Sequence, residues 1–192
     1  VLENCQQPFI ARNGSSSGAW SIPDRWKLNR DFYALIHDNR DPNGRLSLLS
    51  SVWGGSNINV LRNDKMYQVV TLPAGKYKFI LTVPECNVVP GGVKAFGVLF
   101  GMTKGEGTLP DLKGSGESWT PATEADFIDN AGQKSYVLVS DHRVTTSASP
   151  IEVELTVELE KEEVVTIGFV AYIDRGSKGA NADITNISIE RQ

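Results

Sequence analysis

Few residues in this 192-residue sequence have the types and spacing that catalysis requires. The two histidines, His37 and His142, have no Ser or Cys in a recognisable nucleophile motif to accompany them. Paired carboxylates can hydrolyse glycosides, but the densest glutamates alternate along residues 151–160 and are expected to face solvent. The sequence therefore favours a protein that is not an enzyme. A hydrolase with paired acids in the segment 102–133 is the less favoured alternative.

Oxygen-bearing side chains gather in the segment Asp38-Asn39-Arg40-Asp41-Pro42-Asn43-Gly44. The part from Asn39 to Gly44 fits the first half of a calcium loop, but the twelfth position counted from Asn39 is Ser50, where an EF-hand needs a bidentate carboxylate. The EF-hand interpretation therefore fails, and an Asx-rich turn is the simpler one. Zinc is poorly supported, because neither histidine has a second ligand nearby in sequence.

Aromatic residues next to polar ones indicate a sugar site, since a ring can cover the apolar face of a sugar while polar groups bind its hydroxyls. Trp119 lies among Glu117, Ser118 and Thr120 in a long loop, and Trp53 precedes two glycines at a strand end. Polar residues also follow two expected strands. The candidate ligand-binding residues are Trp119, Trp53, His142, Arg143 and Asp174. At each tryptophan the competing interpretation is a ring packed under loops.

Charge and hydropathy exclude several classes of partner. The net charge is -4 and no basic run occurs, which argues against nucleic-acid binding. No apolar run approaches the ~20 residues of a membrane span, so no transmembrane segment is expected. Val1 is not a natural start, and we expect a mature or trimmed chain whose lipid anchor would lie outside it. Cys5 and Cys86 allow one disulfide or two isolated thiols.

Residues 66–83 give the strongest secondary-structure signal. Alternating apolar residues flank Leu72-Pro73-Ala74-Gly75, a turn sequence, and we interpret the segment as a β-hairpin. Residues 151–160 alternate between apolar and acidic residues, which predicts a half-buried antiparallel strand. The glycine-rich segment 94–101 suits a central strand that packs closely on a neighbour. Further strands are expected at 45–53, 58–61, 135–140, 164–173 and 182–189.

The remaining segment, 102–133, is expected to be a long functional or mobile loop with a short helix at 123–127. Eight to ten strands and almost no helix predict an all-β fold, an antiparallel β-sandwich in a single domain spanning residues 1–192.

Two stretches resemble a known family. Lys65-Met66-Tyr67-Gln68 with Leu72-Pro73-Ala74-Gly75-Lys76-Tyr77 resembles a signature of galactose-binding-like jelly rolls, which include carbohydrate-binding modules. The segments 164–170 and 182–189 resemble the closing strands of that fold. Together with the segment from Trp20 to Trp26, they resemble an uncharacterised domain of Bacteroidetes surface lipoproteins.

The resemblance implies a fold, a location and a ligand class. It implies a jelly roll, exported to the outer membrane surface or periplasm, with ligand sites at loop tips. It also implies a structural calcium as a candidate cofactor, with the ligands Asp38, Asp41, Asn43 and Asp183. We therefore expect a non-catalytic carbohydrate-binding or adhesion module whose partner is a glycan or a surface protein. The alternative is a structural or protein-interaction domain of a surface complex with no glycan site.

Overall fold

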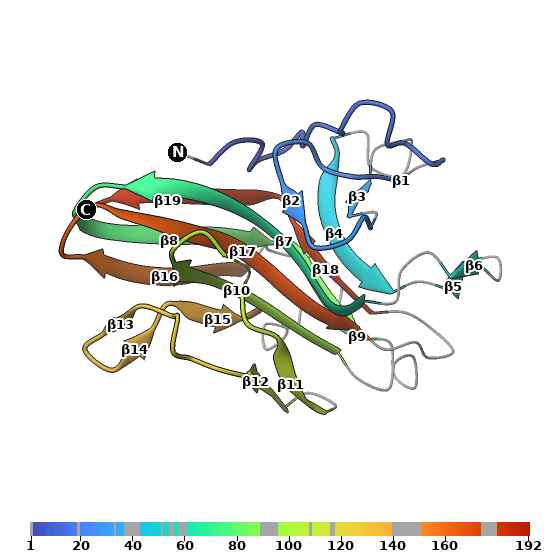
Figure 1. Cartoon of the computed structure of the whole chain (residues 1–192). Coiled ribbons are helices and arrows are strands. Elements are labelled where there is room, and N and C mark those ends of the chain that lie inside the picture. The colour runs from blue at the N-terminus through green and yellow to red at the C-terminus, as the bar shows by residue number, and fades with distance from the viewer. Residues whose placement is uncertain are drawn as a thin grey trace.

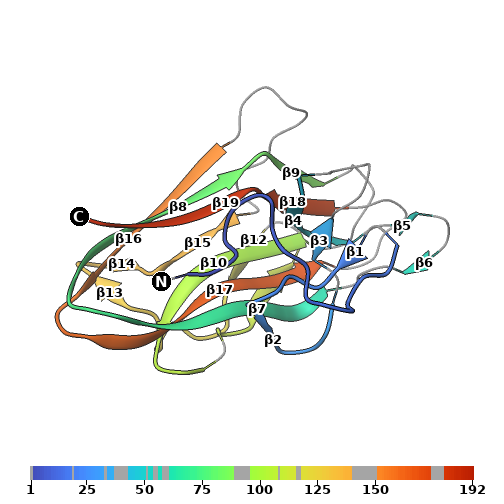
Figure 2. The same cartoon turned by 90° about the horizontal axis from the view of Figure 1, so that it is seen from above.

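Two layers of antiparallel strands make up the fold, seen from the side in Figure 1 and from above in Figure 2. The computed structural model describes residues 2–18, 20–32, 34–36, 43–50, 52–53, 56–57, 61–88, 96–107, 109–115, 118–139, 151–173 and 180–192. No α-helix occurs in these residues, and accordingly none of the described segments is a helix that could span a membrane.

One layer, which we call the front layer although it lies behind the other in the view of Figure 1, consists of two sheets that run into one another. The two sheets are continuous because β8 and β9 are separated by one residue and so are β18 and β19. The strands of the front layer, from one edge to the other, are β16 (Ile151–Leu159), β8 (Gly75–Val83) with β9 (Glu85–Val88), β19 (Asn186–Arg191) with β18 (Ala180–Ile184), β4 (Arg45–Ser50), β3 (Leu35–Ile36) and β1 (Trp20–Ser21).

The back layer is a five-stranded sheet that faces the front layer across the core. Its order is β15 (Tyr136–Leu138), β10 (Phe96–Lys104), β17 (Glu163–Ile173), β7 (Leu61–Leu72) and β2 (Lys27–Leu28). The chain crosses between layers from β7 to β8, from β15 to β16 and from β17 to β18. These repeated crossings between two antiparallel layers confirm the predicted β-sandwich of the jelly-roll type.

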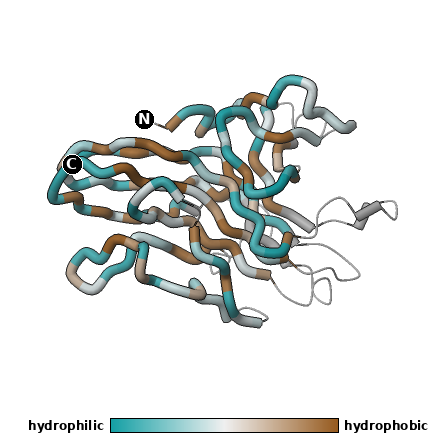
Figure 3. Tube along the Cα trace, in the orientation of Figure 1, coloured by the Kyte–Doolittle hydropathy of each residue, from teal (hydrophilic) through white to brown (hydrophobic). Residues whose placement is uncertain are grey.

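The core lies between the layers. Phe100 and Phe169 on neighbouring back strands have ring centroids 5.0 Å apart, and Phe79 of the front layer contacts Phe100 at 6.3 Å. Trp26, which is fully buried, adds a ring 6.1 Å from Phe169. Figure 3 shows apolar residues recurring along these strands. The alternation predicted for residues 151–160 is confirmed over its described side chains, because Val153, Leu155, Val157 and Leu159 are buried in this core and the glutamates of β16 are exposed.

The predicted hairpin at residues 66–83 is wrong in its pairing, although both strands and the turn exist. β7 pairs with β17 and β2, whereas β8 pairs with β16 and β19. The turn at residues 72–75 therefore joins the back layer to the front layer. The same alternation of apolar residues serves a hairpin or a crossing between layers, since each strand has one core-facing side in both cases.

The predicted long loop is largely ordered into strands. β10 extends to Lys104, and two small hairpins follow: β11 (Leu112–Ser115) with β12 (Ser118–Pro121), and β13 (Asp129–Asn130) with β14 (Gln133–Lys134). The predicted helix at 123–127 is wrong, because this segment forms a turn and Phe127 bridges to Thr103. One further small pair, β5 (Val52–Trp53) with β6 (Ser56–Asn57), follows β4.

Three other predictions can be compared with the structure. The central strand predicted at 94–101 is confirmed over its described part, since β10 lies between β15 and β17 and is buried along its length. Cys5 is a free, half-buried thiol, and the side chain of Cys86 lies outside the described residues. The strand expected at 58–61 falls mostly on residues that are also outside them.

Candidate functional site

Trp119, the leading aromatic candidate, is only 3% exposed. Its ring lies 4.9 Å from that of Tyr172, and it covers Gly97 so closely that a Cβ there would meet the indole at 2.6 Å. It belongs to a second apolar cluster on the outer side of the back layer. The buried members of this cluster are Leu99, Leu109, Leu112, Trp119, Phe127 and Val170. The expectation of an exposed stacking platform is therefore wrong, and Trp119 anchors the β11–β12 hairpin.

The other four ligand-binding candidates remain predictions. The backbone of Trp53 belongs to β5, but its side chain is outside the described residues, and so are His142, Arg143 and Asp174. β15 precedes His142 and Arg143 in the chain, and β17 precedes Asp174. These two strands end at the same end of the back layer, near the start of β10. β15 pairs Leu138 with Leu99, and β17 pairs Ile173 with Phe96.

The proposed calcium ligands are partly described. Asp183 is buried and accepts a hydrogen bond from the Ser47 hydroxyl, and its carboxylate lies 3.1 Å from the Arg45 guanidinium. Arg45 therefore already supplies a positive charge at the carboxylate that calcium would use. Asn43 is exposed, whereas Asp38 and Asp41 lie outside the described residues. Among the described residues, no group of three or more His, Cys, Asp or Glu side chains is arranged so that it could hold a metal ion, and the calcium set stays a prediction.

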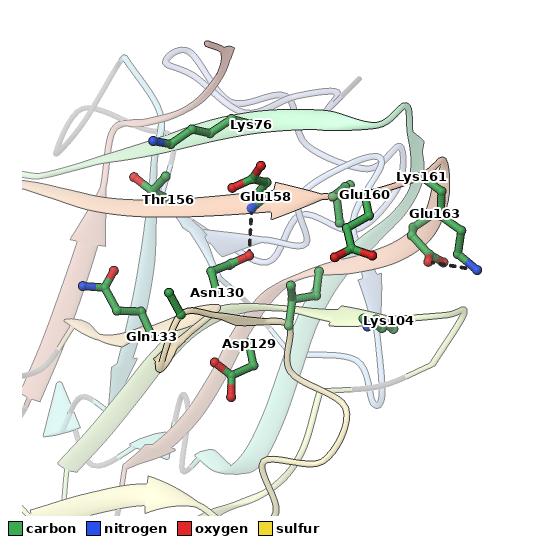
Figure 4. Close-up of a pocket in the computed structure, with 13 residues that line it drawn as sticks. Lys76, Lys104, Asp129, Asn130, Gln133, Thr156, Glu158, Glu160, Lys161 and Glu163 are labelled. Carbon is green, nitrogen blue, oxygen red and sulfur yellow. Dashed lines mark hydrogen bonds and ion pairs between the residues drawn. The ribbon is translucent and has the colours of Figure 1, made fainter.

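The structure presents a different candidate site, a groove of about 680 Å³ between β16 and the β13–β14 hairpin. Figure 4 shows Asn130 and Gln133 extending from the hairpin toward β16, whereas Thr156 and Glu158 lie on the side of β16 that is nearer to Lys76. The residues that line this groove are Lys76, Lys104, Ile128, Asp129, Asn130, Ala131, Gln133, Thr156, Glu158, Leu159, Glu160, Lys161 and Glu163. Most of them are polar, and both signs of charge are present.

The β13–β14 hairpin positions one wall of the groove. Its two loop residues, Ala131 and Gly132, both have positive φ, at 52° and 85°. Two successive residues of positive φ give the type I′ turn that matches strand twist. Asn130 and Gln133 flank this turn as a strand pair. The usual sequence signal for such a turn is Asn-Gly or Asp-Gly. This turn has Ala131-Gly132 in their place, so the sequence does not predict it.

Asn130 joins the hairpin to the other wall. Its Oδ1 accepts a hydrogen bond of 3.1 Å from the backbone N–H of Glu158, 28 residues away in sequence. Its Nδ2 is buried and has no hydrogen-bond partner among the described residues. One side chain thus ties the hairpin to β16 across the groove.

Two charged side chains at the groove form an ion pair or hydrogen bonds with neighbouring groups. Asp129 has a lowered pKa, first because Lys134 donates a hydrogen bond of 3.0 Å to it and then because the N–H of Gly132 does. At the far end, Lys161 lies 3.6 Å from Glu163. A general acid for glycoside hydrolysis needs a raised pKa, so the shift of Asp129 has the wrong direction for that role.

A second cavity of about 570 Å³ continues the groove along β16. Gln133 and Thr156 line both cavities, and Tyr136, Lys134 and Glu154 line the second. The hydroxyl of Tyr136 donates a hydrogen bond of 2.7 Å to Glu124. Desolvation, followed by that hydrogen bond, raises the pKa of Tyr136 to about 12. The tyrosine therefore stays neutral at physiological pH.

No sequence signal indicates this groove. The prediction that the glutamates of 151–160 form a solvated face agrees with their exposure, but it does not show what lies beside them. Asn130 and Gln133 belong to the segment expected to be a loop and carry no motif. Only the folded chain brings them next to Thr156 and Glu158.

The protein is thus an antiparallel β-sandwich of the jelly-roll type that carries an open polar groove. Residues 3–168 match the family described as Domain of unknown function (DUF5013), and the chain belongs to this family. Among solved structures it is similar to that titled "Structure of TmCBM61 in complex with beta-1,4-galactotriose at 1.4 A resolution". That match has 14% sequence identity and a TM-score of 0.44, and covers 88% of this chain and 90% of the other. No curated protein matches the chain.

Proposed function

We propose that this protein is a non-catalytic glycan-binding module whose ligand lies in the groove between β16 and the β13–β14 hairpin. The observation that carries the proposal is the meeting of amide, hydroxyl and carboxylate side chains in one open cavity. Asn130 and Gln133 form one side, and Thr156 and Glu158 form the other. Such groups can donate to and accept from the hydroxyls of a sugar, each of which is both a donor and an acceptor.

The charges of the groove support a neutral polyhydroxyl ligand over a nucleic acid. Both lysines and carboxylates line it, and Lys161 and Lys134 are paired with Glu163 and Asp129. Nucleic-acid sites need a surplus of unpaired cations. The lowered pKa of Asp129 supports binding rather than hydrolysis. No aromatic ring lines the larger cavity, so we expect weak binding of the kind that multivalent display strengthens.

Export is part of the same proposal. The similarity of residues 65–77, 164–170 and 182–189 to a domain of surface lipoproteins supports a location at the outer membrane surface or in the periplasm. A lipid anchor outside this chain would hold it there. Protease accessibility of the natural full-length protein on intact cells tests the surface location, with a cytoplasmic protein as the control.

Affinity electrophoresis against neutral plant and host polysaccharides tests the function. We expect one of them to retard the wild-type protein and Glu158→Ala to weaken that retardation about tenfold, as expected if a charge-assisted hydrogen bond is lost. Glu152→Ala is the matched control, because Glu152 lies on the same exposed face of β16 and lines neither cavity. Equal effects of the two substitutions, or no retardation at all, would contradict the proposal. The latter would favour the protein-interaction alternative.

A further inference from the structure

β16 has one unpaired edge beside the groove. It is the last strand of the front layer and pairs only with β8 among the described residues. In an antiparallel pair, successive residues direct their N–H and C=O groups alternately toward the partner strand and away from it. Half of the β16 backbone therefore points away from β8, toward the two cavities.

The hydrogen bonds between β8 and the β19 side show which residues of β16 direct their backbone groups away from β8. The carbonyls of Lys76 and Thr82 accept from the N–H groups of Gln192 and Thr185, at 2.8 and 3.0 Å, on the β19 side. Even-numbered residues of β8 thus face away from β16, and the even-numbered residues opposite them on β16 must face away from β8. The N–H of Glu158 confirms this directly, since it donates to Asn130.

Two residues of this open edge lie at the cavities. Thr156 lines both cavities and Glu154 lines the second, and both are exposed. Their backbone groups repeat about every 7 Å along the strand. The next outward N–H, that of Glu158, already donates to Asn130. The unpaired part of the edge therefore extends from Thr156 toward Glu152.

We propose that backbone N–H and C=O groups of Thr156 and Glu154 bind the hydroxyls of an extended neutral glycan that runs along the edge of β16. This inference rests on the proposed function and adds the groups that hold the ligand and its direction. Its specificity would come from the spacing of these groups along the strand, and Gln133, which lines both cavities, would contact the ligand from the opposite wall.

The carboxylates of β16 favour a glycan over a protein strand at this edge. Glu152, Glu154 and Glu158 flank it on the exposed face. Charged side chains beside an edge discourage the addition of another strand, and a second copy of β16 would bring like charges together. A neutral glycan meets no such repulsion and can use the same donors and acceptors.

Thr156→Pro tests the proposal directly. Proline removes the outward N–H of residue 156 and leaves the bonds of Leu155 and Val157 to β8, a position that edge strands tolerate. Thr156→Val is the matched control, because it removes the hydroxyl and keeps the N–H. The probes are β-1,4-galactan, xyloglucan, arabinoxylan and mixed-linkage β-glucan. For whichever the wild type binds, we expect Thr156→Pro to bind about tenfold more weakly than Thr156→Val, whose own loss relative to the wild type measures the contribution of the hydroxyl.

Hydrogen exchange of the wild-type protein gives a second measurement that does not depend on the folding of a variant. We expect the bound polysaccharide to slow exchange at the amides of Thr156 and Glu154. The amide of Val157 faces β8 and serves as the internal reference, with unchanged exchange.

The outcomes separate this inference from the function it rests on. If the wild type binds none of the four polysaccharides, the proposed function fails and this inference fails with it. If the wild type binds one but Thr156→Pro binds it as well as Thr156→Val does, the edge is not used and the function survives. The same conclusion follows if the amides of Thr156 and Glu154 exchange at the same rate with and without the polysaccharide. Stronger protection of both amides by an alternating Lys-Thr peptide than by any polysaccharide would assign the edge to a protein strand and overturn the proposal.

Discussion

The two small hairpins that follow β10 come from one stretch of sequence and have opposite roles. The β11–β12 hairpin buries Trp119 against Gly97 and Tyr172 on the back layer. The β13–β14 hairpin presents Asn130 and Gln133 to a groove and contacts β16 through a backbone-to-side-chain hydrogen bond. The first is an extension of the core, and the second is one wall of a polar site.

The comparison shows why an aromatic residue in a long loop is weak evidence for a ligand site. Burying a tryptophan removes a large apolar area from water, and glycines on the adjacent strand provide a flat surface for it. The polar hairpin has no such driving force, so its side chains stay available. In this segment the residues that could bind a ligand are the inconspicuous amides.

Trp119→Ala should have the largest effect. We expect a loss of about 3–5 kcal/mol in the free energy of unfolding, because a buried aromatic is truncated and leaves a cavity over Gly97. Urea denaturation measures it, and Trp119→Phe is the milder control. Unchanged stability combined with lost glycan binding would reverse our comparison and restore Trp119 as a ligand platform.

Gly97→Ala should have the next largest effect. A Cβ at residue 97 would lie 2.6 Å from the Trp119 ring, and overpacking of this kind costs about 1–3 kcal/mol of unfolding free energy. The penalty should largely disappear when Gly97→Ala is made in the Trp119→Ala background. A double-mutant cycle by urea denaturation measures this coupling, and additive effects would show that the two residues do not pack together.

Asn130→Ala should lower stability by about 1 kcal/mol, because the bond to the N–H of Glu158 is lost near the surface. The same change should weaken glycan binding. Gln133→Ala is the control for stability, since its side chain makes no hydrogen bond to β16 in the described structure. If the two variants unfold at the same urea concentration, the contact between hairpin and strand contributes little.

The pH dependence of Asp129 should be the smallest effect. Its pKa is lowered in the folded protein by Lys134 and the N–H of Gly132, so its ionised form stabilises the fold above the ordinary aspartate pKa. That contribution is lost as the pH falls through the lowered pKa. Melting temperatures of the wild type and Asp129→Asn should differ at pH 7 and converge in acid. Lys134→Met should reduce the difference, and a gap that persists in acid would contradict this account.

The strands and the faces they bury were predictable from sequence. The alternation at 151–160 depends only on the two-residue period of an extended chain, and it placed the glutamates of β16 outside correctly. The apolar run at 164–173 likewise identified β17, and the glycines of 94–101 indicated a close neighbour for β10. These signals are local, so they are present in the sequence itself.

Strand partners and the groove were decided only by the tertiary structure. Period-two alternation predicts which side of a strand is buried, but it does not predict which strand lies beside it. It is therefore compatible with a hairpin of β7 and β8, although these strands lie in different layers. The burial of Trp119 depends on Gly97, 22 residues earlier in the sequence. The groove depends on Asn130 meeting Glu158 across 28 residues. Such contacts arise when two hydrophobic faces close on one another, which brings together polar residues that no sequence motif connects.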